Sequence, residues 1–273
     1  MFATEVDASW SFAPVVIASL LAYVAVYAAR WRRVRREHGA RGAAVWRLVS
    51  WVAGVGLIFA ALISPLDRLG EQLASAHMIQ HLLLADLAPI ALILGLTKLI
   101  LRPVTRRVHA IERRAGVFAH PVFGVVAYVG VMWLWHVPAL YDAALAHEAV
   151  HVLEHLTFAA AGLLYWWHLL SPIRSRLRLG GMGPIAYMAG TKVLVGFLGI
   201  ALAFSPELLY AYGPGGTRLG MSPLDDLHVA GLIMGLEQSI IMGIALAYLF
   251  ARMLGESERE AQRAERLEDA PAA

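Results

Sequence analysis

Cysteine is absent from this 273-residue sequence, and charged residues are scarce. Without thiols the chain cannot form disulfides, thiolate metal sites, iron–sulfur clusters, covalently attached haem or a cysteine nucleophile. Charged residues make up 16% of the chain, whereas soluble domains carry about 25%. Hydrophobic residues make up 59%, and the mean hydropathy is +0.62. This composition excludes an ordinary soluble domain and indicates a membrane protein that binds its ligands without sulfur anions.

The apolar residues are gathered into long runs, each near the ~20 residues that a helix needs to cross a bilayer. We therefore expect an all-α, polytopic membrane protein with seven transmembrane helices, followed by a charged cytoplasmic tail. The helical domain is expected at 1–255 and the tail at 256–273. The expected spans lie near 11–29, 43–63, 77–97, 117–137, 150–170, 184–205 and 227–251. Pro89 lies inside the third span, where it should kink the helix and free the carbonyl of Ala85.

Basic residues alternate between the connections of the predicted spans. Of the 23 lysines and arginines, 19 fall in connections on one side, at 30–42, 98–116 and 171–182 and after residue 251. The positive-inside rule places this side in the cytoplasm. The N-terminus is then outside and the C-terminus is cytoplasmic. Because orientation explains the basic clusters, we expect the lipid bilayer as a partner and no nucleic acid.

Histidines of this chain concentrate at the predicted outer surface. His77 and His81 are four residues apart on one helix, so both imidazoles lie on the same face. His151 and His155 repeat this spacing, with His147 one turn further out. The ends of that triplet are ~12 Å apart along the axis, so only one of them can share an ion with His151. These pairs predict a metal site at the outer rim, which His136 or His228 could complete.

The choice of metal follows from the ligand types. Imidazole without thiolate suits copper, zinc, iron or nickel, and nearby thioethers tilt the choice toward Cu(I). Possible soft ligands are Met78 and Met221, with Met132 at a similar height. Carboxylates that could bind the ion or orient the imidazoles are Glu154, Asp225 and Asp226. Copper is the expected cofactor, with zinc or haem b as alternatives.

Three alternative functions remain open: a zinc hydrolase, a b-type cytochrome and a purely structural assembly scaffold. His147–His151 matches HExxH and His151–His155 matches the inverted HxxEH, both patterns of zinc hydrolases. The two patterns share His151, so they cannot both be active motifs. A b-type cytochrome, with histidines from the third and fifth spans as axial ligands of haem, is the second alternative.

Three ionisable residues fall well inside predicted spans, namely Asp86, Lys192 and Glu237. Intramembrane charges are costly and are usually paired or functional. We expect Lys192 to pair with one of the two acids. Nine residues of α-helix separate Asp86 from His77, which should turn the carboxylate away from the histidine face.

Five segments together resemble the CtaG-type cytochrome c oxidase assembly factors of bacterial membranes: HMIQHLLLADLAPIALILG (77–95), WLWHVPALYDAAL (133–145), HVLEHLTFAAAGLLYWWHLLSP (151–172), AFSPELLYAYG (203–213) and SPLDDLHVAGLIMG (222–235). The resemblance implies a seven-helix protein of the bacterial inner membrane. It also implies a role in maturing a heme-copper oxidase, with copper delivered to the oxidase catalytic subunit. On the matching positions the implied copper residues are His77, His81, His136, His151 and His155.

The chain departs from this family pattern at three places. Asp86 and the Leu236–Gln238 segment stand where apolar residues are expected, and His228 stands where the family often has glutamine. The resemblance leads us to expect an assembly factor that is not an enzyme. Its partners would be the oxidase catalytic subunit and another periplasmic copper carrier.

Overall fold

The computed structural model describes residues 6–173, 177, 179–212 and 220–268. All regular elements among these residues are helices, which confirms the all-α class. The predicted basic positions Arg174, Arg176 and Arg178 lie outside the described residues, as do the last five residues of the predicted tail.

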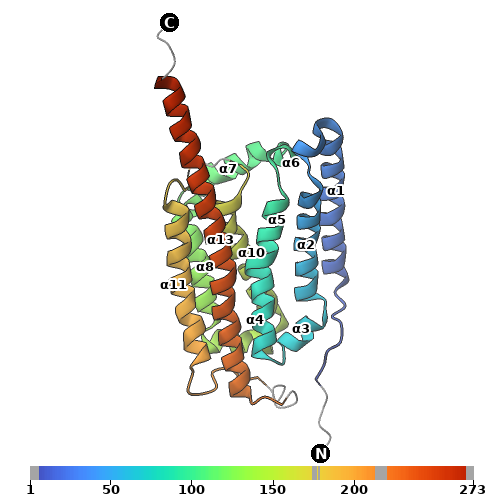
Figure 1. The fold of residues 1–273 in the computed structure, drawn as a ribbon. Helices are drawn as coiled ribbons and strands as arrows, with labels where there is room; N and C mark the ends of the chain where they lie inside the picture. Colours follow the sequence, from blue (N-terminus) through green and yellow to red (C-terminus); the bar gives the residue numbers. More distant parts are fainter. Residues whose placement is uncertain (1–5, 174–176, 178, 213–219, 269–273) are drawn as a thin grey trace, which may run out of the picture.

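Long helices stand side by side in a bundle (Figure 1). They are α1 (Pro14–Gly42), α2 (Val45–Leu62), the continuous series α4 (Ala74–Leu82), η1 (Leu83–Leu87) and α5 (Ala88–Gly95), then α8 (Pro121–Trp135), α10 (Glu148–Leu170), α11 (Gly183–Ala203) and α13 (Pro223–Glu268). The connections contain α3 (Pro65–Gly70), α6 (Lys98–Leu101), α7 (Thr105–Ala115), the 3₁₀ turn η2 (Gly116–Ala119) and α9 (Pro138–Ala146).

Among the described residues, five helices have the length and apolar content to cross a membrane: α1, α2, the α4–α5 series, α11 and α13. A sixth is reached if α8 is counted together with the preceding helix, from which it is bent by 65°. The predicted number of seven spans stays a prediction. The remaining predicted span corresponds to α10, which is 23 residues long but carries two glutamates and three histidines.

The fourth apolar helix begins later than the sequence pattern predicts. Residues 117–119 form part of the turn η2, and α8 starts at Pro121. The reason is local, because Gly116 has a positive φ and His120 caps the new helix by accepting a hydrogen bond from the Val122 amide. Proline at the first position of a helix is compatible with a start but not with continuation from the preceding helix.

The two ends of the bundle differ in their elements. The start of α1 and α3 lie at one end, while α6, α7 and the end of α13 lie at the other (Figure 1). The histidine-bearing α4 is at the N-terminal end. That this end faces outward stays a prediction. Helix α13 continues without interruption through the predicted boundary at residues 255 and 256.

Packing places α10 among its neighbours, in contact with α8, α9, η1 and α5. Helix α13 packs on α11 and on α4. The buried core contains several large aromatic side chains, among them Tyr128, Tyr165 and Trp166. These contacts hold α4 and the first half of α10 close together, with the ring centroids of His77 and His155 5.9 Å apart.

Candidate metal centre

Four side chains converge between α4 and α10. They are His77 of α4 and His151, Glu154 and His155 of α10, and one potential ligand atom from each lies within 4.8 Å of all the others. The histidine pair on α10 is the one at 151 and 155, consistent with the distance argument against His147 and His155 sharing an ion. Three imidazoles and one carboxylate therefore surround one point.

Glu154 lies at the junction of the two histidine pairs. Its Oε2 is 3.4 Å from Nε2 of His77, and its Oε1 is 3.4 Å from Nε2 of His81. The ring centroids of His77 and His81 are 4.3 Å apart, and those of His151 and His155 are 4.2 Å apart. Each carboxylate oxygen thus faces a different imidazole of α4.

Burial makes this cluster unusual, because its polar atoms lack ordinary hydrogen bonds. Glu154 and His77 are fully inaccessible to solvent. Both carboxylate oxygens, both ring nitrogens of His77 and of His81, and Nε2 of His151 and His155 have no hydrogen-bond partner. The 3.4 Å separations are longer than good N–H···O bonds. A buried polar atom left unsatisfied costs about 1–3 kcal/mol, so this arrangement favours a bound cation.

Asp226 fixes the start of the helix that carries His77. Its carboxylate accepts hydrogen bonds from the backbone amides of Ala74 and Ser75, at 2.7 and 3.3 Å, and from the Ser75 hydroxyl. These amides are the unpaired donors at the N-terminus of α4. An acid from α13 therefore caps α4, which explains its position without a role in binding metal.

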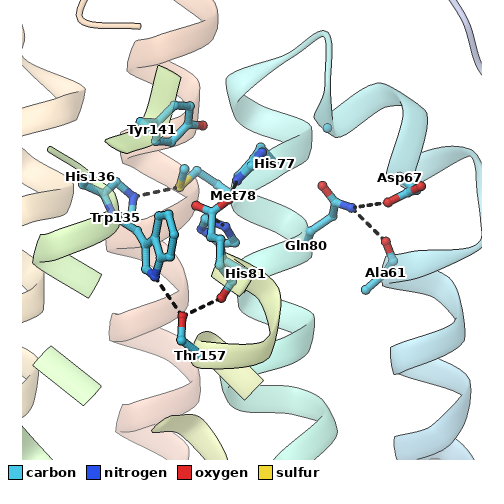
Figure 2. A network of polar contacts seen from close by, with 12 residues as sticks. Ala61, Asp67, His77, Met78, Gln80, His81, Trp135, His136, Tyr141 and Thr157 are labelled. Carbon is cyan, nitrogen blue, oxygen red and sulfur yellow. Dashed lines mark hydrogen bonds and ion pairs between the residues drawn. The ribbon is translucent and has the colours of Figure 1, made fainter. Parts of the chain in front are cut away.

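Gln80 anchors α4 to its neighbours beside the histidine face (Figure 2). Its side-chain amide donates to the Ala61 carbonyl at 2.8 Å and to Asp67 at 3.2 Å. The side chain of Gln80 is fully buried. This contact links α4 to the end of α2.

A π-helical turn separates the histidines from the rest of their span. Pro89 has no amide hydrogen, and the turn η1 precedes it, closed by a bond from the Ala88 amide to the Leu83 carbonyl. This is the form that the predicted proline distortion takes. Gly162 of α10 lies against it, since a Cβ at residue 162 would be 2.0 Å from the Ala85 carbonyl oxygen. The missing side chain allows α10 to approach the histidine helix.

Three tyrosines cover the cluster and are called the tyrosine cap: Tyr141, Tyr210 and Tyr212. The Tyr141 ring lies 5.1 Å from the His77 ring and stacks on Tyr210 at 3.7 Å. The hydroxyls of Tyr141 and Tyr212 are 2.6 Å apart. Burial raises the pKa of Tyr212, so this phenol stays neutral. The cap closes the site with neutral aromatic groups.

His136 lies beside the cluster, next to a methionine (Figure 2). Its ring centroid is 6.0 Å from that of His81. Its Nε2 is 3.4 Å from Sδ of Met78, and its Nδ1 is 2.6 Å from the Met132 carbonyl oxygen. Of the soft ligands expected from the sequence, Met78 is in this group.

Other predicted site residues have different surroundings. His147 is exposed at the N-cap of α10, and Nε2 of His228 is hydrogen-bonded to the Ser205 carbonyl at 2.9 Å. Asp225 is exposed and accepts hydrogen bonds from Ser222. Met221 is half-buried and is not part of the His136 contact. In the hydrolase patterns, only the inverted HxxEH has all three of its named residues in the cluster.

The structure corrects one expectation about Asp86 and leaves another open. Its carboxylate accepts hydrogen bonds from the Tyr128 hydroxyl at 2.7 Å and from the Trp166 indole at 2.8 Å, and the pairing of Lys192 with one of the two acids stays a prediction. Asp86 also lines a small cavity together with His81 and Glu237. The turn η1 changes the helical register, so the half-revolution calculated for an α-helix does not apply.

Some contributors were missed from the sequence. Glu154 was expected as one of several carboxylates, yet it alone joins both histidine pairs; its position within HxxEH was the available signal. Tyr141 and Gln80 gave no signal, because an aromatic or an amide near a helix end has many ordinary explanations. The metal-binding role of every one of these residues stays a prediction.

Comparison with known proteins gives distant relatives in mycobacteria. Uncharacterized proteins of Mycobacterium leprae and Mycobacterium bovis are each 24% identical to this chain over 95% of its length. The alignment covers 42% of each relative, so the chain spans less than half the length of these proteins. No solved structure matches the chain.

A family description covers most of the chain. Residues 25–256 match the cytochrome c oxidase caa3 assembly factor family, Caa3_CtaG. The matched range contains α2 to α11, most of α13, and every histidine of the cluster. The resemblance expected from the sequence motifs is thereby confirmed, and the chain belongs to the cytochrome c oxidase caa3 assembly factor family.

Proposed function

We propose that this chain binds copper at His77, His151, Glu154 and His155 and delivers it to the catalytic subunit of a cytochrome c oxidase. The observation that supports the proposal most is the set of buried, unpartnered nitrogen and oxygen atoms within 4.8 Å of one another. Copper is the cargo here and not a resident cofactor, so the site has to release it as well as hold it.

The ligand set fits a borderline metal ion. Imidazoles favour copper and zinc, and a carboxylate adds one negative charge where water is excluded. The 3.4 Å separation between Nε2 of His77 and Oε2 of Glu154 suits bonds of about 2.0 Å from one ion to both atoms at a tetrahedral angle. Between copper and zinc, membership of an oxidase assembly family favours copper.

Transfer by ligand exchange is the mechanism we infer. His81 faces the second oxygen of Glu154, so it can take a ligand position while another imidazole leaves. The side chains only donate electron pairs, and no covalent intermediate forms on the protein. Such a site holds and passes an ion and needs no catalytic turnover.

Metal analysis of the full-length protein in detergent tests the binding step. After loading with Cu(II) and removal of excess ion, the wild-type chain should retain one copper, and His77→Ala and His155→Ala should lose most of it. His147→Ala is the matched control, because this exposed histidine lies outside the cluster. Equal copper content in all four proteins would refute the proposed site.

Delivery needs a second measurement. In a host that depends on this chain, the copper content of the isolated oxidase catalytic subunit should fall in the His77→Ala and His155→Ala strains and remain normal with His147→Ala. A fully metallated oxidase in the first two strains would show that the chain assists assembly in another way.

A further inference from the structure

A small cavity beside the histidine–glutamate cluster has a different ligand chemistry. Its volume is about 20 Å³, room for roughly one water-sized particle. Three methionines from three helices line it, Met78, Met132 and Met234, together with His136 and His81 and the two acids Asp86 and Glu237. Thioethers select Cu(I) over harder ions. These methionines are buried, so their sulfur atoms face protein and not lipid.

Hydrogen bonding fixes which nitrogen of His136 is free. The Met132 carbonyl can only accept a hydrogen bond, so the Nδ1 that lies 2.6 Å from it must carry the proton. In a neutral imidazole Nε2 is then unprotonated. His136 is buried, and burial disfavours the charged form. Nε2 therefore presents a lone pair to the sulfur of Met78.

Two electron-pair donors thus face each other across 3.4 Å with no proton between them. Neither atom stabilises the other, whereas a cation would stabilise both. With metal bonds of about 2.0 Å to nitrogen and about 2.3 Å to sulfur, an ion that contacts both atoms subtends an angle of about 105°. This is close to tetrahedral.

We propose that His136, Met78, Met132 and Met234 form a second metal site, selective for Cu(I) and distinct from the histidine–glutamate cluster. The inference rests on the proposed function for the identity of the cargo, but its ligands are separate. His81 connects the two sites, since its ring lies 4.3 Å from that of His77 and 6.0 Å from that of His136. An ion can pass between the sites by exchanging ligands at His81.

Binding of Ag(I), a redox-inert substitute for Cu(I), to the full-length protein in detergent tests this site. The test variant is Met78→Leu combined with Met132→Leu, since leucine replaces methionine with little change in volume. The matched control is Met188→Leu, another buried methionine outside the cavity. We expect the double variant to lose Ag(I) affinity at least about tenfold, and Met188→Leu to bind as the wild type does.

A cross-comparison separates this proposal from the proposed function. In Glu154→Gln with His155→Ala, Ag(I) should still bind at the methionine site while Cu(II) is lost. In the methionine double variant, Cu(II) should be retained. Two results would overturn the second site. One is wild-type affinity for Ag(I) in the variant with Met78→Leu and Met132→Leu. The other is loss of both Ag(I) and Cu(II) in the variant with Glu154→Gln and His155→Ala. If the wild-type protein binds Ag(I) but does not retain Cu(II), the proposed function is overturned and the second site stands.

Discussion

Gly162 allows a prediction in which every proposed ligand is kept and only the helix spacing changes. A Cβ added at this position would lie 2.0 Å from the Ala85 carbonyl oxygen and 2.7 Å from its Cα. Both neighbours are backbone atoms of η1, so no side chain can rotate away. To restore an ordinary 3.4 Å contact, α10 and η1 must separate by about 1.4 Å. Gly162→Ala should therefore loosen the packing of α10 beside the histidine helix.

The magnitude follows from overpacking, which costs about 1–3 kcal/mol in a well-packed interior. Replacing glycine with alanine inside a helix also stabilises the helix by about 1 kcal/mol. The steric cost is therefore measured against a control variant that gains the same helix propensity. Gly130→Ala serves, because a Cβ there meets no atom within 4 Å. The difference between the two variants should be about 1–3 kcal/mol, or about 2–12 °C in melting temperature.

Thermal unfolding in detergent and Cu(II) retention are the two measurements. His155 is seven residues, or about 10 Å, from Gly162 along α10, so the displacement should also reach the metal centre and lower copper retention. If Gly162→Ala melts at the same temperature as Gly130→Ala and holds as much copper, the close approach of α10 and η1 does not position the site.

Further predictions concern the cap of α4, metal removal and haem. Asp226→Ala should lower stability by about 1–2 kcal/mol because the amides at the start of α4 lose their acceptor, while exposed Asp225→Ala should cost less; thermal unfolding compares the two. Removing copper with a chelator should lower the melting temperature of the wild type. The loss of stability should be about 2.7 kcal/mol if the free ion stood at 100 times its Kd. An equal decrease in melting temperature in His77→Ala would count against binding at the cluster. Protein from haem-replete cells should show no Soret band, and a strong band would revive the cytochrome alternative.

Much of the fold could be predicted because the length and hydropathy of apolar runs identify membrane helices in a sequence. The apolar runs correspond to long helices, and the expected proline distortion is present before Pro89. The transmembrane signal is weaker for α10, because polar residues that include His151, Glu154 and His155 of the cluster lower its hydropathy. Polar residues that form a buried cluster also lower the mean hydropathy of the helix that carries them, which weakens the signal for a membrane span.

The site was predictable only in part, because helical spacing shows which residues share a face but not which faces meet. The i,i+4 pairs indicated His77 with His81 and His151 with His155, whereas the central place of Glu154 depends on helix packing. Register was the other obstacle. The five residues of η1 turn the chain by less than an α-helix would, and this put Asp86 on an unexpected side.

The tyrosine cap has a consequence for timing. Tyr141 stacks on Tyr210 and shares a short hydroxyl contact with Tyr212, whose own hydroxyl donates to the Gly70 carbonyl. Because the Tyr141 ring lies against the His77 ring, the rate at which a bound ion leaves should depend on the motion of this ring as well as on ligand strength. A docking protein that pulled the Tyr210–Tyr212 segment aside would hasten unloading without altering any coordinating atom.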